Sequence, residues 1–205
     1  MKQHNFQPGK IDKCQICSSD RLKNIMNIGD QPLANSLISN LSDENSVKRY
    51  PINIIRCEEC TLLQLDYIVD QNKVYHPEYP YLPGITKTVD NEQKDLADYL
   101  FSALKLKNND LVVDIGSNDG SLLKHFKAKG LQTVGVEPTN IAKIANENGI
   151  QTIQSFFNEN AAEDVIQKYK KAKMITCTNV FAHMSTLGDV MDGIVKLLDE
   201  DFKAF

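Results

Sequence analysis

Two Cys-x-x-Cys pairs constrain the fold of this chain most, because four thiols at this spacing can close a metal cage. The pairs are Cys14 with Cys17 and Cys57 with Cys60, and they account for four of the five cysteines. Such a low cysteine content does not suit a disulfide scaffold. Two knuckles separated by a moderate insert fit a closed, tetrahedral, structural zinc site. Unmetallated thiols, or a disulfide within each pair, are the alternatives.

Apolar runs on both sides of the second pair predict a zinc ribbon. Residues 52–55 are rich in isoleucine and precede Cys57, and residues 62–65 are rich in leucine and follow Cys60. A strand, a metal turn and a second strand are the layout of a ribbon. We therefore expect a zinc-binding module over residues 11–66.

The segments between and after these strands are predicted as connections and a helix. The Gly and Pro within 28–33 predict a loop between the two cysteine pairs. Residues 67–106 are predicted to form a connector followed by a helix over 90–106, where apolar residues recur at three- and four-residue spacing. Thr88 or Asp90 is the expected cap of that helix.

The remainder of the chain, residues 107–205, alternates short apolar strands with helices. The expected strands are 111–115, 132–136, 150–153 and 174–178, and the expected helices are 121–128, 141–148, 162–170 and 189–198. This alternation predicts a parallel sheet with helices on both faces. The predicted fold class is therefore α/β, preceded by a zinc-ribbon-like module.

A glycine turn ends the first predicted strand and begins a helix. Its sequence is Asp114-Ile115-Gly116-Ser117-Asn118-Asp119-Gly120. Gly116 permits a tight turn beneath a ligand, and helix N–H groups from about Gly120 onward point toward that ligand. A strand, a glycine turn and a helix in this order bind nucleotide-type cofactors.

A glutamate follows the second predicted strand, in Val136-Glu137-Pro138. It comes about 20 residues after the turn, the distance expected of an acid that accepts both hydroxyls of a ribose. The alternative is a surface glutamate after a strand. Asn118 stands where dinucleotide-binding turns have their middle glycine, and Asn118 and Asp119 offer acceptors for an amino-acid ammonium group. The pattern thus favours S-adenosylmethionine over NAD.

Charge and hydropathy argue against several classes of partner. The net charge of -4 attracts neither nucleic acid nor an anionic membrane. The ribbon strands lack a clustered Lys/Arg face or stacking aromatic residues. Residues 1–10 are polar and unlike a signal peptide, and no stretch approaches the roughly 20 apolar residues of a membrane span. We expect a cytoplasmic protein with neither nucleic acid nor membrane as partner.

Seven motifs follow one another along the chain: Cys14-x-x-Cys17, Gly29-x-x-Pro32-Leu33-Ala34-Asn35, Cys57-x-x-Cys60, Tyr79-Pro80-Tyr81, the glycine turn, Val136-Glu137-Pro138 and Asn179-Val180-Phe181-Ala182-His183. Together they resemble one enzyme family, the sugar C-methyltransferases that act on nucleotide-linked deoxysugars. The resemblance implies a structural zinc module followed by a class I methyltransferase domain with a Rossmann-like sheet. The first four strands of that sheet have the order 3-2-1-4.

The resemblance also implies a reaction and two residues near its substrate. A 4-keto sugar nucleotide loses the proton at C3, and the resulting enolate attacks the sulfonium methyl of S-adenosylmethionine. His183 is expected to face the substrate as an acid, a base or a hydrogen-bond donor to the carbonyl. Tyr81 is expected near the substrate, with Tyr79 as the second choice. A histidine held by packing, and tyrosines that pack a linker, are the alternatives.

The cofactor site implied by the resemblance extends beyond the glycine turn. Asn179 is expected near the methionine part of S-adenosylmethionine, while Ser155 and Phe156 are expected to flank the adenine. Phe156 equally suits a core position. The complete expected set is Asp114, Gly116, Ser117, Asn118, Asp119, Glu137, Pro138, Ser155, Phe156 and Asn179.

The family sheet continues as 3-2-1-4-5-7-6, whereas this sequence ends near where strand five would begin. Strand four is therefore expected to form an exposed apolar edge. We expect a truncated or split product that keeps the zinc site and much of the cofactor site, with little turnover unless a separate C-terminal polypeptide completes it. The alternatives are a small methyltransferase of other specificity with a zinc docking module, and a non-enzymatic zinc-ribbon binding module.

Overall fold

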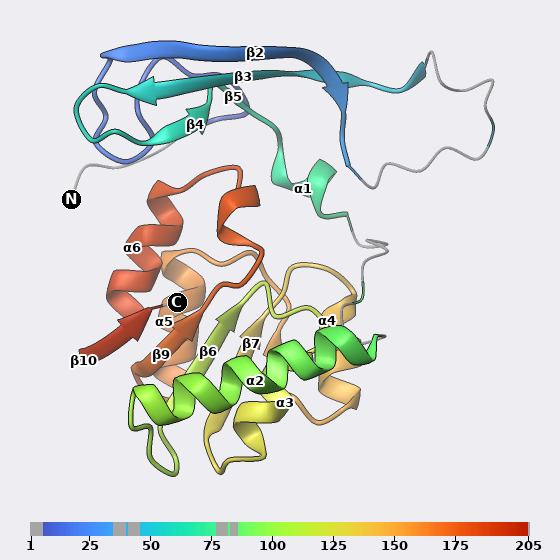
Figure 1. The fold of residues 1–205 in the computed structure, drawn as a ribbon, viewed down its shortest axis with the longest axis vertical. Helices are drawn as coiled ribbons and strands as arrows, with labels where there is room; N and C mark the ends of the chain where they lie inside the picture. Colours follow the sequence, from blue (N-terminus) through green and yellow to red (C-terminus); the bar gives the residue numbers. More distant parts are fainter. Residues whose placement is uncertain (1–5, 35–39, 41–45, 77–81, 83–85, 205) are drawn as a thin grey trace. The chain divides into compact units, whose positions relative to one another are not determined.

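The computed structural model describes residues 6–34, 40, 46–76, 82 and 86–204, with side chains described up to residue 200 (Figure 1). The chain divides into two compact units. The first comprises Met1–His76 together with Met184–Asp189, and the second comprises Pro77–His183 together with Val190–Phe205.

The first unit is built on antiparallel strands (Figure 1). Its larger sheet has the order β2-β3-β4 and its smaller sheet pairs β1 with β5. The elements are β1 (Gly9–Lys10), β2 (Leu22–Pro32), β3 (Arg49–Cys57), β4 (Leu63–Leu65), β5 (Tyr67–Ile68) and the short helix α1 (Gln71–Val74). The two strands predicted around the second cysteine pair are thus present as β3 and β4.

The loop predicted over 28–33 is wrong, because this stretch belongs to β2 as far as Pro32. Two register shifts relative to β3 take up the irregular residues, one between Asn24 and Met26 and one between Asn27 and Gly29. Gly29 has φ +81°, and its N–H donates to Asn27 Oδ1 at 2.7 Å. A bulge accommodates such a glycine without ending the strand.

The second unit contains a five-stranded sheet in which all neighbouring strands are parallel (Figure 1). The order is β10-β9-β6-β7-β8, from the strands β6 (Leu111–Ile115), β7 (Gln132–Val136), β8 (Thr152–Ile153), β9 (Ala172–Thr176) and β10 (Leu198–Ala204). Numbered from β6, the first four strands have the order 3-2-1-4. The predicted α/β class and strand order are therefore confirmed.

The prediction that the fourth strand forms an exposed edge is wrong. β10 pairs in parallel with β9, matching Leu198 with Ala172 and Lys203 with Met174, and the register shifts between these two pairs. The sequence of β10 is LDEDFKA, which lacks the continuous apolar run of the inner strands. Main-chain pairing holds this strand, so hydropathy alone did not reveal it.

Helices of the second unit precede the sheet or connect its strands. They are α2 (Lys87–Ala103), α3 (Ser121–Lys127), α4 (Ile141–Glu147), α5 (Glu159–Lys168) and α6 (Gly188–Leu197), which starts at the end of the first unit. The helix α2 comes before β6, and each of the others lies between two successive strands. Two of these helices begin earlier than predicted because a polar side chain caps them. Thr86 Oγ1 accepts from Val89 N at 3.4 Å, and Asn158 Oδ1 accepts from Ala161 N at 3.0 Å.

One core cluster of the second unit packs the sheet against the helices α2 and α3. All five residues of β6 are buried. Buried apolar side chains from α2, α3, β6 and β9 form one cluster, which includes Leu100, Val112, Leu123, Phe126 and Met174. Burial of each large side chain contributes about 1.5–3 kcal/mol to folding. This core fixes β6 as the central strand.

Among the described helices, none is both long and apolar enough to cross a membrane.

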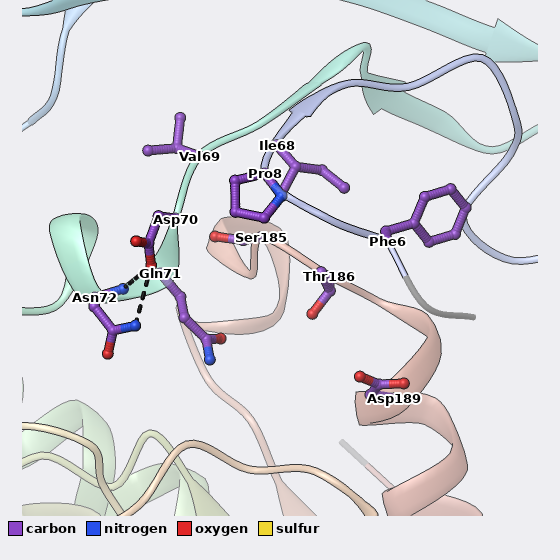
Figure 2. A pocket seen from close by; sticks show the side chains of 10 residues that line it. All are labelled: Phe6, Pro8, Ile68, Val69, Asp70, Gln71, Asn72, Ser185, Thr186 and Asp189. Carbon is purple, nitrogen blue, oxygen red and sulfur yellow. Dashed lines mark hydrogen bonds between the residues drawn. The ribbon is translucent and has the colours of Figure 1, made fainter. Parts of the chain in front are cut away.

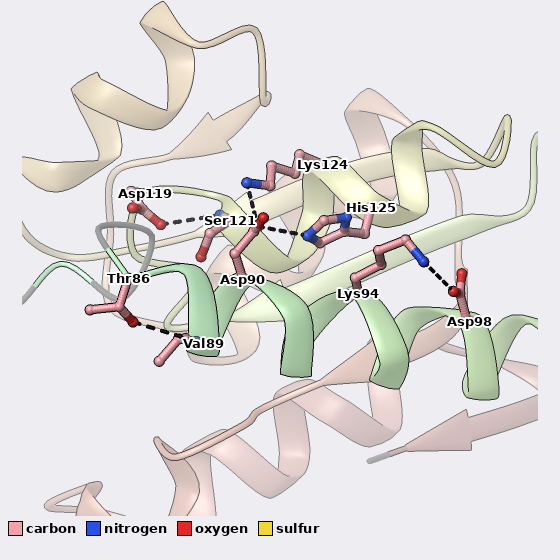
Figure 3. Close-up of polar contacts among 9 residues, drawn as sticks. All are labelled: Thr86, Val89, Asp90, Lys94, Asp98, Asp119, Ser121, Lys124 and His125. Carbon is pink, nitrogen blue, oxygen red and sulfur yellow. Dashed lines mark hydrogen bonds and ion pairs between the residues drawn. The ribbon is translucent and has the colours of Figure 1, made fainter.

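Ion pairs join α2 to α3 (Figure 3), and a further pair joins α2 to the turn after α3. Asp90 Oδ1 lies 2.6 Å from Lys124 Nζ and 2.9 Å from His125 Nε2. Further along α2, Asp98 pairs with Lys94 at 2.9 Å and also with Lys129. Hydrogen bonds from Lys129 and Lys94 lower the pKa of Asp98 to about 2.

The depressed pKa of Asp98 predicts how the stability of this unit depends on pH. Asp98→Asn should lower the free energy of unfolding at pH 7, because it removes both ion pairs. The stabilisation is present above the ordinary carboxyl pKa of 3.8 and is lost as the pH falls toward about 2. Urea unfolding between pH 7 and pH 3 should show the two proteins converging. Asp95→Asn is the matched control, since Asp95 is exposed and forms no ion pair within the described residues. Equal unfolding free energies for the two variants at pH 7 would contradict the role given to Asp98.

Candidate functional site

The four cysteines of the two pairs converge in the first unit. All four Sγ atoms lie within 4.8 Å of one another, with Cys14 and Cys60 at 3.5 Å and Cys17 and Cys57 at 3.5 Å. A tetrahedron with Zn–S bonds of about 2.3 Å has edges of roughly 3.8 Å. The donor set therefore fits one zinc ion with four sulfur ligands, and the predicted structural zinc site is confirmed.

Each cysteine pair lies in a tight turn whose backbone supports the site. Ser18 and Thr61, which follow the second cysteine of each pair, have φ +60° and +65°. Burial raises the pKa of the Cys14 thiol to about 12, whereas hydrogen bonding from the backbone of Cys60 lowers the pKa of Cys57 to about 6. Zinc must displace the Cys14 proton to bind, so its affinity should fall in acid.

The second candidate site lies where the parallel strands β6, β7 and β9 end. Gly116 N donates to Val136 O at 2.8 Å and so joins the glycine turn to the end of β7. Gly116 has φ +69°, and a Cβ at this position would lie 2.7 Å from Val180 Cγ1. Only glycine fits beneath Val180, so the segment after β9 lies directly against the turn. The fold thus brings together three segments that the sequence analysis singled out.

The rest of the glycine turn is closed by its own polar side chains. Asn118 has φ +50°, and its Oδ1 accepts from Asp119 N at 2.8 Å. Asp119 Oδ1 accepts from Ser121 N at 3.1 Å at the start of α3. Gly120 has φ +77°, and a Cβ there would lie 2.9 Å from the Ile150 side chain. The oxygens predicted to face an ammonium group therefore have main-chain partners in this structure.

Glu137 is buried and hydrogen-bonded to the protein on both carboxylate oxygens. Oε2 accepts from Asn118 N at 3.0 Å, which links the glutamate to the glycine turn. Oε1 accepts from Thr139 N at 2.9 Å and from Thr139 Oγ1 at 2.7 Å. The surface glutamate considered as the alternative is thus excluded, since only 5% of Glu137 is exposed.

Asp114 is a second buried carboxyl group at the same edge of the sheet. Thr176 Oγ1 donates to Asp114 Oδ1 at 2.6 Å from the neighbouring strand β9. Burial raises the pKa of Asp114 to about 7, and the negative charge of Glu137 adds to the rise. Thr176 and Thr139 were not among the residues predicted from the sequence. A polar residue ending an apolar strand was a signal for Thr176, but its partner depends on strand register.

The other predicted residues lie in the loops after these strands. Ser117 is buried, and Pro138, Ser155 and Phe156 are partly buried. Within the described part of the chain, Ser117 Oγ and Ser155 Oγ are buried and have no hydrogen-bond partner. A Cβ on Gly135 of β7 would lie 2.2 Å from Ser117 Oγ, so this glycine makes room for the serine.

The residues expected to contact the substrate are exposed or lie outside the described residues. Asn179 is exposed with φ +56°, and His183 is exposed at the end of a short 3-10 helix, Phe181–His183. His183 N donates to Val180 O at 2.9 Å. Tyr81 and Tyr79 lie outside the described residues.

A pocket of ≈ 240 Å³ lies in the first unit, and its lining includes none of the predicted site residues (Figure 2). Its lining combines apolar and polar side chains: Phe6, Pro8, Ile68, Val69, Asp70, Gln71, Asn72, Ser185, Thr186 and Asp189. Asp70 Oδ1 accepts hydrogen bonds from Asn72 within this lining. In the same unit, Leu187 N donates to Gln15 Oε1 at 3.0 Å, which attaches residues 184–189 to the first cysteine turn.

Comparison with known families matches both parts of the chain. Residues 14–75 match the model of a zinc-binding domain, and residues 88–205 match the model of a methyltransferase domain. The C-methyltransferase NovU of Streptomyces niveus is 28% identical over 192 residues, which cover 93% of this chain. The match covers 46% of NovU, so the chain spans about half the length of this relative.

Solved structures of methyltransferases are also similar to part of the chain. The plantazolicin methyltransferase BamL, solved with S-adenosylhomocysteine, is 20% identical with a TM-score of 0.45, covering 56% of this chain and 44% of BamL. A methyltransferase from Geobacter sulfurreducens, also solved with S-adenosylhomocysteine, is 16% identical with a TM-score of 0.40. That match covers 67% of this chain and 54% of the Geobacter protein.

The four-cysteine site predicts that zinc binding requires both Cys-x-x-Cys pairs. Cys57→Ser should reduce the zinc content from about one ion per chain to near zero after dialysis against a weak chelator. Cys177→Ser is the matched control, because Cys177 follows β9 and lies outside the cage. Atomic emission of the purified chains measures both. Wild-type zinc content in Cys57→Ser would contradict a four-sulfur site.

The raised pKa of Asp114 predicts the opposite pH dependence from that of Asp98. A carboxyl group whose folded pKa is raised favours the folded state at low pH, and this contribution is lost as the pH rises through about 7. The free energy of unfolding of Asp114→Asn, relative to that of the wild type, should therefore rise by on the order of 2 kcal/mol between pH 5 and pH 8. Urea unfolding at both values measures the change. Asp164→Asn, on the exposed face of α5, should show no such gain, and parallel behaviour of the two variants would refute the prediction.

Proposed function

The chain belongs to the methyltransferase family whose model matches residues 88–205, and on this premise we propose that it binds S-adenosylmethionine at the carboxyl ends of β6 and β7 and transfers its methyl group. The observation that carries the proposal is the contact between Glu137 Oε2 and Asn118 N at 3.0 Å. It places a buried carboxylate against the glycine turn, where the hydroxyls of an adenosyl ribose would be recognised.

The charge of this edge supports S-adenosylmethionine over a pyrophosphate-containing cofactor. Asp114 and Glu137 are both buried carboxyl groups close enough for the charge of Glu137 to raise the pKa of Asp114. Two acids disfavour a pyrophosphate but suit the sulfonium and ammonium groups of S-adenosylmethionine. Ser117 and Ser155 add buried hydroxyl groups that have no partner among the described residues. We propose that Gly116, Asn118, Asp119, Pro138, Phe156 and Asn179 complete the cofactor site.

We propose C-methylation of a keto-deoxysugar nucleotide as the reaction. In this step a base takes the proton next to the carbonyl, and the resulting enolate carbon attacks the methyl group. The C–S bond breaks, and its electron pair stays on sulfur as a neutral thioether, S-adenosylhomocysteine. NovU is named a C-methyltransferase, which supports methylation at carbon. His183 is proposed to act on the substrate carbonyl or its proton, with Tyr81 nearby.

The organisation of the whole protein is likewise a proposal. A zinc module over 11–66, a connector and helix over 67–106 and a methyltransferase domain over 107–205 would divide structural and cofactor roles between them. Because the chain spans about half of NovU, we propose that further sequence, or a separate polypeptide, supplies the remaining substrate contacts.

Calorimetric titration of S-adenosylmethionine into the zinc-loaded chain tests the proposed site. Saturable binding is expected, and Glu137→Ala should weaken it about 10- to 100-fold, because a hydrogen bond to a charged group contributes about 1.5–3 kcal/mol. Glu147→Ala is the matched control, since Glu147 is an exposed residue of α4. Equal affinities of the two variants, or no binding by the wild type, would contradict the assignment.

A further inference from the structure

The two oxygens of the Glu137 carboxylate have unequal hydrogen bonding. Oε1 accepts two bonds, from Thr139 N at 2.9 Å and from Thr139 Oγ1 at 2.7 Å. Oε2 accepts one, from Asn118 N at 3.0 Å. Because a carboxylate oxygen accepts about two hydrogen bonds, Oε1 is filled by Thr139, whereas Oε2 retains an acceptor position among the described residues.

Thr139 is itself firmly held at the start of α4. It is 1% exposed, and its Oγ1 also accepts from Ile141 N at 3.3 Å. Its carbonyl oxygen accepts from Ala142 N at 3.2 Å. One side chain thus ties the first turn of α4 to the carboxylate that follows β7. A carboxylate held in this way has a fixed rotamer, which leaves less freedom to lose when a ligand binds.

We propose that Thr139 is a positioning residue, which fixes Glu137 through Oε1 so that Oε2 alone accepts a hydroxyl group of the adenosyl ribose. The inference rests on the function proposed above and deepens it. The ribose hydroxyl donates to the acceptor position of Oε2 that Asn118 N leaves open. Recognition of the ribose hydroxyls, rather than of the cofactor as a whole, therefore depends on the Thr139 hydroxyl.

A purely structural role for Thr139 makes a different prediction. Its hydroxyl accepts from Ile141 N at the start of α4, so Thr139→Val would lower stability and weaken the binding of every ligand by the same factor. A positioning role instead changes the ratio of affinities between ligands that have and lack a ribose hydroxyl. The ratio is therefore the informative measurement.

The experiment measures the affinities of S-adenosylhomocysteine and of its 2′-deoxy and 3′-deoxy analogues by calorimetry on the zinc-loaded chain. In the wild type at least one deoxy analogue should bind about 10-fold or more weakly, because Glu137 loses a charged hydrogen bond. Thr139→Val and Thr139→Ala should reduce this ratio to about 3-fold or less, since the carboxylate is no longer fixed. Thr139→Ser keeps the hydroxyl and should restore the wild-type ratio.

Two controls separate the role of Thr139 from general effects. Thr133→Val makes the same change at another buried threonine, in β7, and should leave the ratio unchanged. In a Glu137→Gln background, Thr139→Val should change the ratio no further, because both substitutions act on the same group.

The outcomes distinguish this inference from the proposed function. If Thr139→Val lowered the affinities of all three ligands by the same factor, the inference would be overturned and the cofactor site would stay in place. Additive effects of Thr139→Val and Glu137→Gln on the ratio would also overturn it. A wild type that binds none of the three ligands would overturn both the inference and the proposed function.

Discussion

The parallel pairing of β6 with β7 on one side and β9 on the other is the constraint on which the rest of the second unit depends. In this register Asp114 lies opposite Gly135 and opposite Thr176. The carboxyl ends of three strands therefore lie at one edge of the sheet, and each strand positions a different part of the proposed site. β6 delivers the glycine turn, β7 delivers Glu137, and β9 delivers the hydroxyl that binds Asp114. Side chains far apart in the sequence become neighbours through main-chain hydrogen bonds.

Much of this arrangement could be predicted from local sequence. The short apolar runs gave β6, β7 and β9 because buried parallel strands are apolar throughout. The two Cys-x-x-Cys pairs gave the zinc site, since ligand spacing is a local property. The glycine turn and Glu137 followed from a spacing along the chain that a strand and a helix impose.

The features that escaped prediction depend on partners distant in the chain. β10 is a charged segment that becomes a strand by pairing with β9, so no apolar pattern in the sequence predicted it. Residues 28–32 continue β2 because bulges accommodate Gly29, although Gly and Pro usually end a strand. Thr139 and Thr176 bind carboxylates identified in advance, yet only the folded geometry shows which hydroxyl binds which acid.

The two sites draw on different physical effects. Thiolate–zinc bonds can stabilise a small antiparallel module whose strands leave several apolar side chains exposed, including Met26 and Leu63. The proposed cofactor site at the carboxyl ends of β6 and β7 instead depends on a packed core and on buried carboxyl groups that hydroxyl and amide groups hold in place. The zinc ion therefore supports structure, and the proposed chemistry belongs to the α/β unit.

The most direct test of this account is a crystal structure of the zinc-loaded chain with S-adenosylhomocysteine bound. The account predicts the ribose at the carboxyl ends of β6 and β7, with one hydroxyl on Glu137 Oε2 and with Oε1 still bonded to Thr139. Ligand bound elsewhere, or a ribose with no contact to Glu137, would contradict it.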